Sequence, residues 1–171
     1  MNININLNKA GSIKEAINAI KAYRKEIDLK VDKLVKTLAN DGVIVAKSWL
    51  GATQGDSTRA NIGLDFDDEG NIHRAVISLS GEDALFVEFG AGYYYNASDP
   101  PHADEFGYGV GTYPGQTHAF QRGWFYYDDS GNLVYSHGTE ATYPIYHAGE
   151  NIRNEVILKA LEIFRSLLWI Y

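Results

Sequence analysis

The sequence predicts an α+β fold, a small and mainly antiparallel β-sheet packed by a long N-terminal helix and a C-terminal helix. Residues 12–50 repeat apolar side chains at helical spacing, residues 59–80 hold two alternating runs, and residues 147–171 return to helical spacing. A chain of 171 residues suits one domain with its own core, so we expect residues 1–171 to form a single α+β domain.

The first two elements are a strand and a long helix. Residues 2–7 alternate polar and apolar side chains, the period of a half-buried strand. Ser12 and Glu15 match the capping box that starts a helix. The helix is expected to reach about residue 50, with a bend or break allowed at residues 40–42 (NDG). Its apolar stripe consists of Ile13, Ile17, Ile20, Ile27, Val31, Leu34 and Leu38.

Residues 59–66 and 72–80 alternate again and predict a β-hairpin, because the short sequence DDEGN joins them. The run ALFVEFGAG follows at residues 84–92 and places a single carboxylate, Glu88, among apolar residues. The apolar face of the first strand consists of Ile62, Leu64 and Phe66.

Residues 92–147 hold fourteen of the 22 aromatic residues, eight of the 17 glycines and all four prolines. Residues 92–136 are therefore expected to form an aromatic- and glycine-rich insertion, with a hairpin at residues 123–138 that turns at DDSGN. A structureless loop of this length is uncommon in a compact domain. The aromatic side chains should therefore pack on the domain or on neighbouring proteins.

Residues 147–171 predict the last helix, and Glu150 is expected in its first turn, where the helix dipole favours an anion. Its apolar stripe consists of Ile152, Val156, Ile157, Leu161, Phe164 and Leu168.

The net charge of −7 is unevenly distributed. Residues 1–50 hold nine Lys/Arg and five Asp/Glu, giving +4; residues 51–147 hold three and fourteen, giving −11; the remainder is balanced. An acidic surface argues against nucleic-acid binding, which needs clustered Lys and Arg. The first residues do not predict a secretory signal, and we expect no membrane span because no apolar run is long enough. The opposite charges could orient copies of the chain, although a solvated basic helix beside acidic loops explains the same pattern.

The sequence contains no strong motif for catalysis, metal binding or phosphate binding. The five histidines show no HExxH or HxH spacing, and residues 99–105 (DPPHADE) match no calcium loop. There is no cysteine and no GxSxG, and the adjacency of Ser136 and His137 does not establish a catalytic pair. Residues 107–115 lack the Lys-Ser/Thr of a phosphate-binding loop. We expect no catalytic residue, metal or cofactor, and a carboxylate pair for glycoside hydrolysis is the enzymatic alternative.

The run ALFVEFGAG is similar to the apolar-Val-Glu-aromatic-Gly-Thr-Gly signature of neck and tail-completion proteins, which join a filled head to a tail in long-tailed bacteriophages. Ala91 stands where Thr is more usual. Residues 123–148 resemble the family's second signature, a Trp/Tyr strand and turn followed by a Pro, apolar residues and an Ala that opens the last helix. Residues 109–120 resemble an insertion common in members from phages of Gram-positive hosts. The second signature is carried by Pro144, Ile145 and Ala148.

This resemblance covers nearly the whole chain and implies a structural virion protein without catalysis. Its relatives form rings, often hexameric, at the head–tail interface or at the top of the tail tube. The expected partners are further copies of the chain and neighbouring neck, adaptor, tail-tube or terminator proteins. The expected location is the neck or tail of the virion, and the host cytoplasm during assembly.

The resemblance also assigns structural roles to the motif residues. Val87 and Phe89 should face the core from a short strand, with Glu88 on its other side. There Glu88 could pair with a cation, at an interface, or cap backbone N–H groups where the chain turns, and a strand residue that simply faces solvent is the alternative. Gly90 and Gly92 allow the backbone angles that end the strand abruptly. The complete set of motif residues is Phe89, Gly90, Gly92, Pro144 and Ala148.

Ring assembly needs anchors that bury area at low entropic cost, which Tyr and Trp provide. Packing within the domain is the alternative for each of them. Two other functions stay open, a small phage-encoded cell-wall glycoside hydrolase and a carbohydrate-binding module with an aromatic platform. If the basic helix meets the acidic loops between copies, assembly should depend on salt. The aromatic interface candidates are Tyr93, Tyr94, Tyr95, Trp124, Phe125, Tyr126 and Tyr127.

Overall fold

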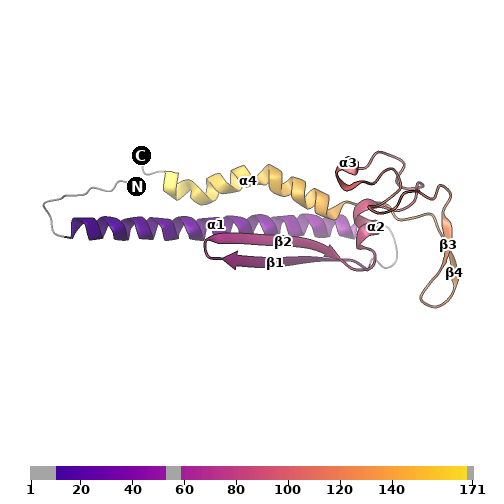
Figure 1. The fold of residues 1–171 in the computed structure, drawn as a ribbon, viewed down its shortest axis with the longest axis horizontal. Coiled ribbons are helices and arrows are strands. Elements are labelled where there is room, and N and C mark those ends of the chain that lie inside the picture. Colours follow the sequence, from indigo (N-terminus) through magenta and orange to yellow (C-terminus); the bar gives the residue numbers. More distant parts are fainter. Residues whose placement is uncertain (1–10, 53–58, 169–171) are drawn as a thin grey trace.

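The computed structural model describes residues 11–52 and 59–168, so the strand expected at residues 2–7 lies outside the described residues. The α+β class is confirmed, and the strands form two antiparallel two-stranded sheets (Figure 1). The elements are α1 (Ser12–Gly51), β1 (Asn61–Glu69), β2 (Ile72–Ser80), α2 (Ala84–Phe89), α3 (Ala103–Phe106), β3 (Trp124–Tyr127), β4 (Leu133–Ser136) and α4 (Pro144–Leu168).

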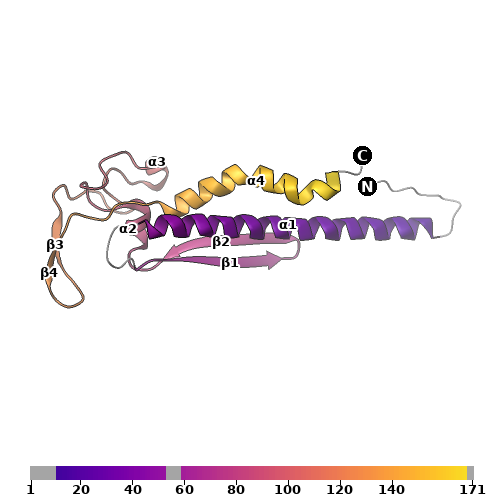
Figure 2. The same cartoon turned by 180° about the vertical axis from the view of Figure 1, so that it is seen from behind.

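α1 is the axis of an elongated molecule (Figures 1 and 2). The β1–β2 hairpin lies along one side of α1, and α4 runs antiparallel along another. Lys30 Nζ donates a hydrogen bond to the backbone oxygen of Ile163 at 2.8 Å, which places the last turns of α4 beside Lys30. The N-terminal part of α1 therefore extends beyond α4 and the hairpin, while the β3–β4 hairpin projects at the opposite end (Figure 2). Among the described helices, none is both long and apolar enough to cross a membrane.

α1 is continuous through residues 40–42, where the sequence allowed a bend or break. Gly42 has a packing role instead. A Cβ at this position would lie 2.7 Å from Ile77 Cδ1 of β2 and 2.8 Å from Ile152 Cδ1 of α4. The missing side chain lets α1 contact the hairpin and α4 at the same level. The start of α1 also differs from the expected capping box, because Gly11 holds the N-cap position and Ser12 is the first helical residue.

The β1–β2 hairpin confirms the predicted strands and turn, and it confirms the apolar face at Ile62 and Leu64, whereas Phe66 of the predicted face is 44% exposed. The register pairs Ile62 with Leu79 and Leu64 with Ile77, and these residues lie on the half-buried face. Gly70 has a φ of 65°, which the tight turn between the strands requires. Neither edge of this two-stranded sheet is paired with another described strand.

The core is small for the length of the chain. The surface exposed by all 171 residues is 11832 Å², whereas a compact monomer of 19.0 kDa exposes about 8,400 Å². Much apolar surface in the described part is uncovered, including Ile13, Ile17 and Ile20 of α1 and Ile157, Leu158 and Leu161 of α4. The buried hydrophobic residues of the described part are Ala16, Leu38, Ala39, Ala46, Ala60, Val87, Ala91, Tyr108 and Ala148.

Candidate functional site

Glu88 connects α2 to the start of α4. Its Oε2 accepts a hydrogen bond from the Ile145 N–H at 2.8 Å, and its Oε1 accepts one from the Tyr146 N–H at 3.0 Å. Pro144, the first residue of α4, has no N–H, and the His147 N–H donates to the carbonyl that precedes Pro144 at 3.0 Å. The N–H groups that a helix start leaves unpaired therefore all have partners, and the carboxylate lies at the positive end of the helix dipole.

The predicted strand around Glu88 is wrong, because Ala84–Phe89 form the short helix α2. A short apolar run does not distinguish a strand from a helical turn, and the partner here is α4 rather than another strand. Val87 is buried as expected, while Phe89 is half-buried. Of the two contacts that the sequence left open for Glu88, the structure shows capping of backbone N–H groups.

Burial is the largest influence on the pKa values of Glu88 and of the two tyrosines near it. It raises the pKa of Glu88 above its ordinary value, and the N–H groups of Ile145 and Tyr146 offset this only in part. Burial, followed by the proximity of Tyr143 and Glu88, raises the pKa of Tyr108 to about 12. The pKa of Tyr143 is also raised, first by burial and then by Glu88. Glu88 is thus a largely buried carboxyl beside two phenols that stay neutral.

Asn96 closes the base of the insertion and is only 9% exposed. Its Nδ2 donates to the backbone oxygens of Thr139 at 2.9 Å and Gly92 at 3.0 Å, and its Oδ1 accepts from the Ala141 N–H at 2.9 Å. Next to it, Ala91 and Thr139 exchange two backbone hydrogen bonds of 3.0 and 2.9 Å. The buried amide of Asn96 therefore links the segment that enters the insertion, at Gly92, to the segment that leaves it, at Thr139.

Two glycines make room for this arrangement. Gly90 ends α2 with a φ of 78°, and a Cβ there would lie 2.4 Å from the Asn96 Oδ1. Gly138 has a φ of 110°, and a Cβ there would lie 1.9 Å from the Ala91 oxygen. The positive φ values predicted for Gly90 and Gly92 are confirmed, with 84° at Gly92, but Gly90 ends a helix rather than the predicted strand. Sequence reasoning missed Asn96, because no local pattern marks a side chain whose partners Thr139 and Ala141 lie over 40 residues away.

Pro144 and Ala148 are both buried at the start of α4. Pro144, not Ala148, opens the helix, because α4 begins three residues before the predicted start. For the same reason Glu150 lies beyond the first turn, so its predicted place near the helix dipole is wrong. Glu150 instead forms an ion pair with Arg153.

The aromatic candidates of the insertion are mostly exposed. Trp124 is the exception, because it is half-buried and its ring centroid lies 5.1 Å from that of Phe120. The exposed fractions are 45% for Tyr93, 61% for Tyr94, 48% for Tyr95, 65% for Phe125, 46% for Tyr126 and 72% for Tyr127. Intradomain packing therefore accounts for Trp124 and leaves between 45% and 72% of the others exposed.

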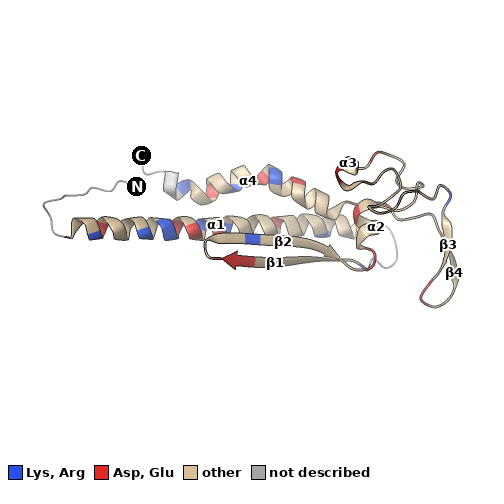
Figure 3. Ribbon diagram, in the orientation of Figure 1, with Lys and Arg blue, Asp and Glu red and all other residues tan. Residues whose placement is uncertain are grey.

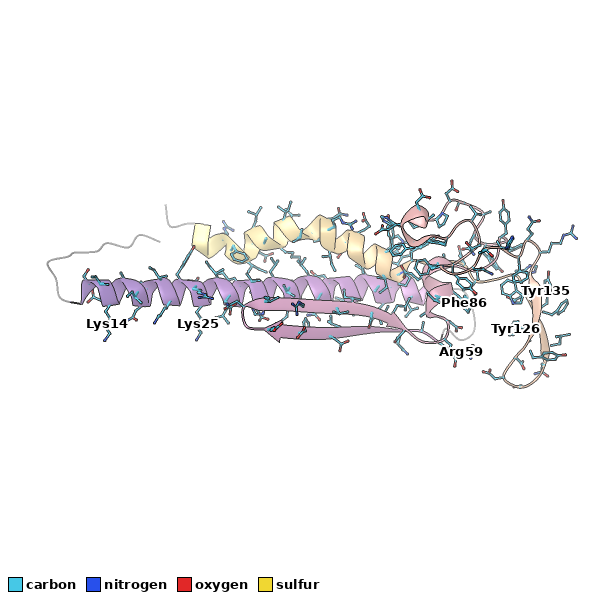
Figure 4. The ribbon with its side chains drawn as sticks, in the orientation of Figure 1. Lys14, Lys25, Arg59, Phe86, Tyr126 and Tyr135 are labelled. Carbon is cyan, nitrogen blue, oxygen red and sulfur yellow. The ribbon has the colours of Figure 1, made fainter. Side chains whose placement is uncertain are left out.

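The predicted hairpin in the insertion is confirmed as β3–β4, and one of its faces consists entirely of exposed residues. Phe125 pairs with Tyr135 and Tyr127 pairs with Leu133, so these four side chains point to the same side, which we call the tip face. All four are exposed, Tyr135 by 43% and Leu133 by 58%. The hairpin extends away from α1, with Tyr126 and Tyr135 at the far end of the molecule from Lys14 (Figure 4).

A cavity of about 550 Å³ lies beside Glu88, enclosed by β2, α2, α3 and α4; we call it the α2–α4 cavity. Leu85 and Phe106 are 49% and 52% exposed and contribute apolar wall. Its ionisable lining residues are Glu88, His102, Glu105, Glu150 and Arg153. His102 Nδ1 lies 3.0 Å from a Glu105 carboxylate oxygen. The cavity combines apolar walls with an acidic lining.

A second polar cluster, which sequence reasoning missed, lies where α1 meets the β1–β2 hairpin. His73 Nδ1 lies 2.8 Å from Asp68 Oδ1, and His73 Nε2 lies 3.1 Å from Asp28 Oδ1. Hydrogen bonds to Asp68 and Asp28 raise the pKa of His73. Donor atoms of Asp32, Asp68 and His73 lie within 4.8 Å of one another, close enough for a metal ion. However, Lys36 Nζ lies 2.6 Å from Asp32 Oδ1, so an ion-pair network accounts for the same geometry. The i, i+4 spacing of Asp28 and Asp32 was the available sequence signal.

Comparison of this chain with protein-family models, with curated proteins and with solved structures finds no match. The likeness to phage neck proteins therefore rests on the sequence motifs alone.

Proposed function

We propose that this chain is a structural protein of the bacteriophage neck, which completes the tail or joins it to the head by assembling into a ring and performs no catalysis. The observation that supports this proposal best is the distribution of apolar surface. The exposed isoleucines near the start of α1 and the exposed tip face lie at opposite ends of an elongated chain (Figure 1).

Exposed apolar surface at separate places is typical of a protein that is buried in an assembly. A stable protein–protein contact removes about 800 Å² from each partner, and aromatic side chains contribute most to its affinity. The tip face supplies Phe125, Tyr127 and Tyr135 on a hairpin that the base of the insertion holds in place. The signature residues lie where α2 is joined to α4. Glu88 caps the start of α4, Gly90 ends α2, and Pro144 is the first residue of α4, so each signature residue has a structural role.

Analytical ultracentrifugation of the purified chain, followed by negative-stain electron microscopy, tests this proposal. We expect a closed ring in equilibrium with the monomer at concentrations of about 100 μM or below. A chain that stays monomeric throughout that range contradicts the proposed self-assembly. The genes on either side provide a separate check, because the proposal requires capsid, portal or tail-tube genes nearby.

The cell-wall glycoside hydrolase is kept as a second candidate because of one observation. Glu88 has a raised pKa and lines a cavity that also holds Glu105 and Glu150, and a carboxyl with a raised pKa can act as a general acid. Against this, both Glu88 oxygens already accept backbone N–H groups. Hydrolysis of purified peptidoglycan that Glu105→Gln or Glu150→Gln abolishes, while the fold is retained, would establish the enzyme and overturn the structural role.

A further inference from the structure

The apolar stripe of α1 continues beyond the elements that cover it. Along the described helix the stripe advances by four, three, seven and four residues, from Ile13 and Ile17 through Ile20 to Ile27 and Val31. Ile27 and Val31 are half-buried near the end of α4, whereas Ile13, Ile17 and Ile20 are 57%, 46% and 53% exposed. The stripe is therefore a helix-packing surface along its whole length, and within the described part of the chain its first third has no helix against it.

This free end of α1 is basic. Residues 12–25 carry Lys14, Lys21, Arg24 and Lys25 against Glu15, giving +3. Lys14 and Lys25 extend away from α4 on a part of α1 that the hairpin does not reach (Figure 4). Two copies of this end placed together would bring like charges into contact, which is unfavourable.

The opposite end of the molecule carries exposed apolar residues and acidic residues, which complement the basic start of α1. The α2–α4 cavity offers the exposed apolar walls Leu85 and Phe106. The loop that leads into α3, residues 99–105, carries Asp99, Asp104 and Glu105 and no Lys or Arg, giving −3. Figure 3 shows basic residues along the N-terminal part of α1 and acidic residues at α3, with the length of the body between them.

We infer that the α2–α4 cavity binds the free end of α1 from a second copy of this chain. The side chains of Ile13, Ile17 and Ile20 enter the cavity between Leu85 and Phe106, and the flanking lysines pair with acids of α3. This inference rests on the proposed ring assembly and specifies its contact. Because the two surfaces differ and lie at opposite ends of each copy, the contact is head-to-tail, and repeating it either closes a ring or extends a filament.

A head-to-tail contact can be tested by complementation. Ile17→Asp disables the helix surface, Leu85→Asp disables the cavity surface, and each position is about half exposed, so the monomer should keep its fold. Ile44→Asp is the matched control, because Ile44 is a 67% exposed isoleucine on the opposite face of the same helix. Circular dichroism checks the fold of each variant, and sedimentation velocity measures its assembly.

We expect each of Ile17→Asp and Leu85→Asp alone to raise the apparent dissociation constant at least about tenfold, and Ile44→Asp to leave it unchanged. An equimolar mixture of Ile17→Asp and Leu85→Asp should form a dimer and stop there, since only one intact pair of surfaces remains. Assembly that ignores both variants, or a mixture that stays monomeric, overturns this contact while leaving ring assembly in place. A wild-type chain that never assembles overturns the proposed function as well.

Charge reversal gives a second readout that does not depend on apolar packing. Lys21→Glu and Glu105→Lys should each weaken assembly, and the double variant should restore at least part of the loss. A double variant that assembles no better than either single variant would contradict the proposed pairing of the two ends.

Discussion

The base of the insertion and its tip belong to the same aromatic-rich segment but are built in opposite ways. At the base, Asn96 is buried and its amide makes hydrogen bonds to the chain on both sides of the opening. At the tip, Phe125 and Tyr127 are 65% and 72% exposed on a hairpin of four-residue strands. The segment is therefore fixed where it leaves the body and uncovered where it extends furthest.

This difference separates positions that set the conformation from positions that remain available for contact. Substitutions at the base should unfold or misplace the insertion, while substitutions at the tip should leave the monomer intact. The predictions below test this separation, and a base that tolerates change or a tip that does not would contradict it.

The largest effect is expected at the base. Asn96→Ala removes three hydrogen bonds. The Thr139 oxygen keeps the hydrogen bond from the Ala91 N–H, whereas the Gly92 oxygen and the Ala141 N–H lose the partner that Asn96 provides. Because a buried polar group without a partner costs about 1–3 kcal/mol, we expect the free energy of unfolding to fall by about 2 kcal/mol or more. Urea denaturation measures this loss. Asn154→Ala, on the exposed face of α4, is the matched control and should change stability by less than about 0.5 kcal/mol.

Glu88→Ala should have the next largest effect. It removes the acceptor for the Ile145 and Tyr146 N–H groups, and loss of a helix cap costs about 1–2 kcal/mol. Thermal and urea denaturation should both show the loss. Glu88→Gln keeps one acceptor oxygen and the shape of the side chain, so its stability should fall between those of Glu88→Ala and the wild type.

The pH dependence of Glu88 has a defined sign. Burial raises its pKa in the folded chain above the unfolded value, so the folded state binds this proton more tightly. As the pH falls from neutral through the folded pKa toward the ordinary carboxyl range, the wild type should therefore gain stability relative to Glu88→Gln. If the stability difference between the wild type and Glu88→Gln stays constant over this pH range, the pKa of Glu88 is not raised in the folded chain.

The sequence predicted these regions unequally, for physical reasons. The long helix and both hairpins depend on residue spacing and on turn residues a few positions apart, so their existence and type were predictable. α2 was not, because six apolar-rich residues fit a strand or a helix until α4 supplies N–H groups for Glu88. Asn96 and the His73 cluster depend on partners from distant segments, which no local pattern encodes. Gly42 was taken as a break signal because its packing against Ile77 and Ile152 exists only in the folded chain.

His73 should give a smaller effect that depends on pH. It faces Asp28, Asp32 and Lys36 of α1 and Asp68 of β1, and the hydrogen bonds to Asp68 and Asp28 raise its pKa. The protonated ring therefore stabilises the contact below its unfolded pKa, and this contribution disappears as the pH rises through the folded pKa.

The stability difference between the wild type and His73→Gln should accordingly shrink from about pH 5.5 to about pH 8.5. Denaturation at several pH values measures it. His118→Gln is the control for replacing a histidine, because His118 is exposed in the insertion and its replacement should change stability by less than about 0.5 kcal/mol. If the stability of His73→Gln changes with pH in parallel with that of the wild type, His73 does not stabilise the fold by being protonated.

The smallest effect on monomer stability is expected at the tip face. Replacing Phe125, Tyr127 and Leu133 together by serine removes exposed apolar surface that touches little of the body, so each change should cost less than about 0.5 kcal/mol. Assembly should respond instead, since exposed aromatic side chains are the anchors available on this hairpin. Sedimentation velocity and urea denaturation on the same triple variant separate the two outcomes. A large loss of stability with normal assembly would mean that the tip face supports the monomer, and the contrast between base and tip would then fail.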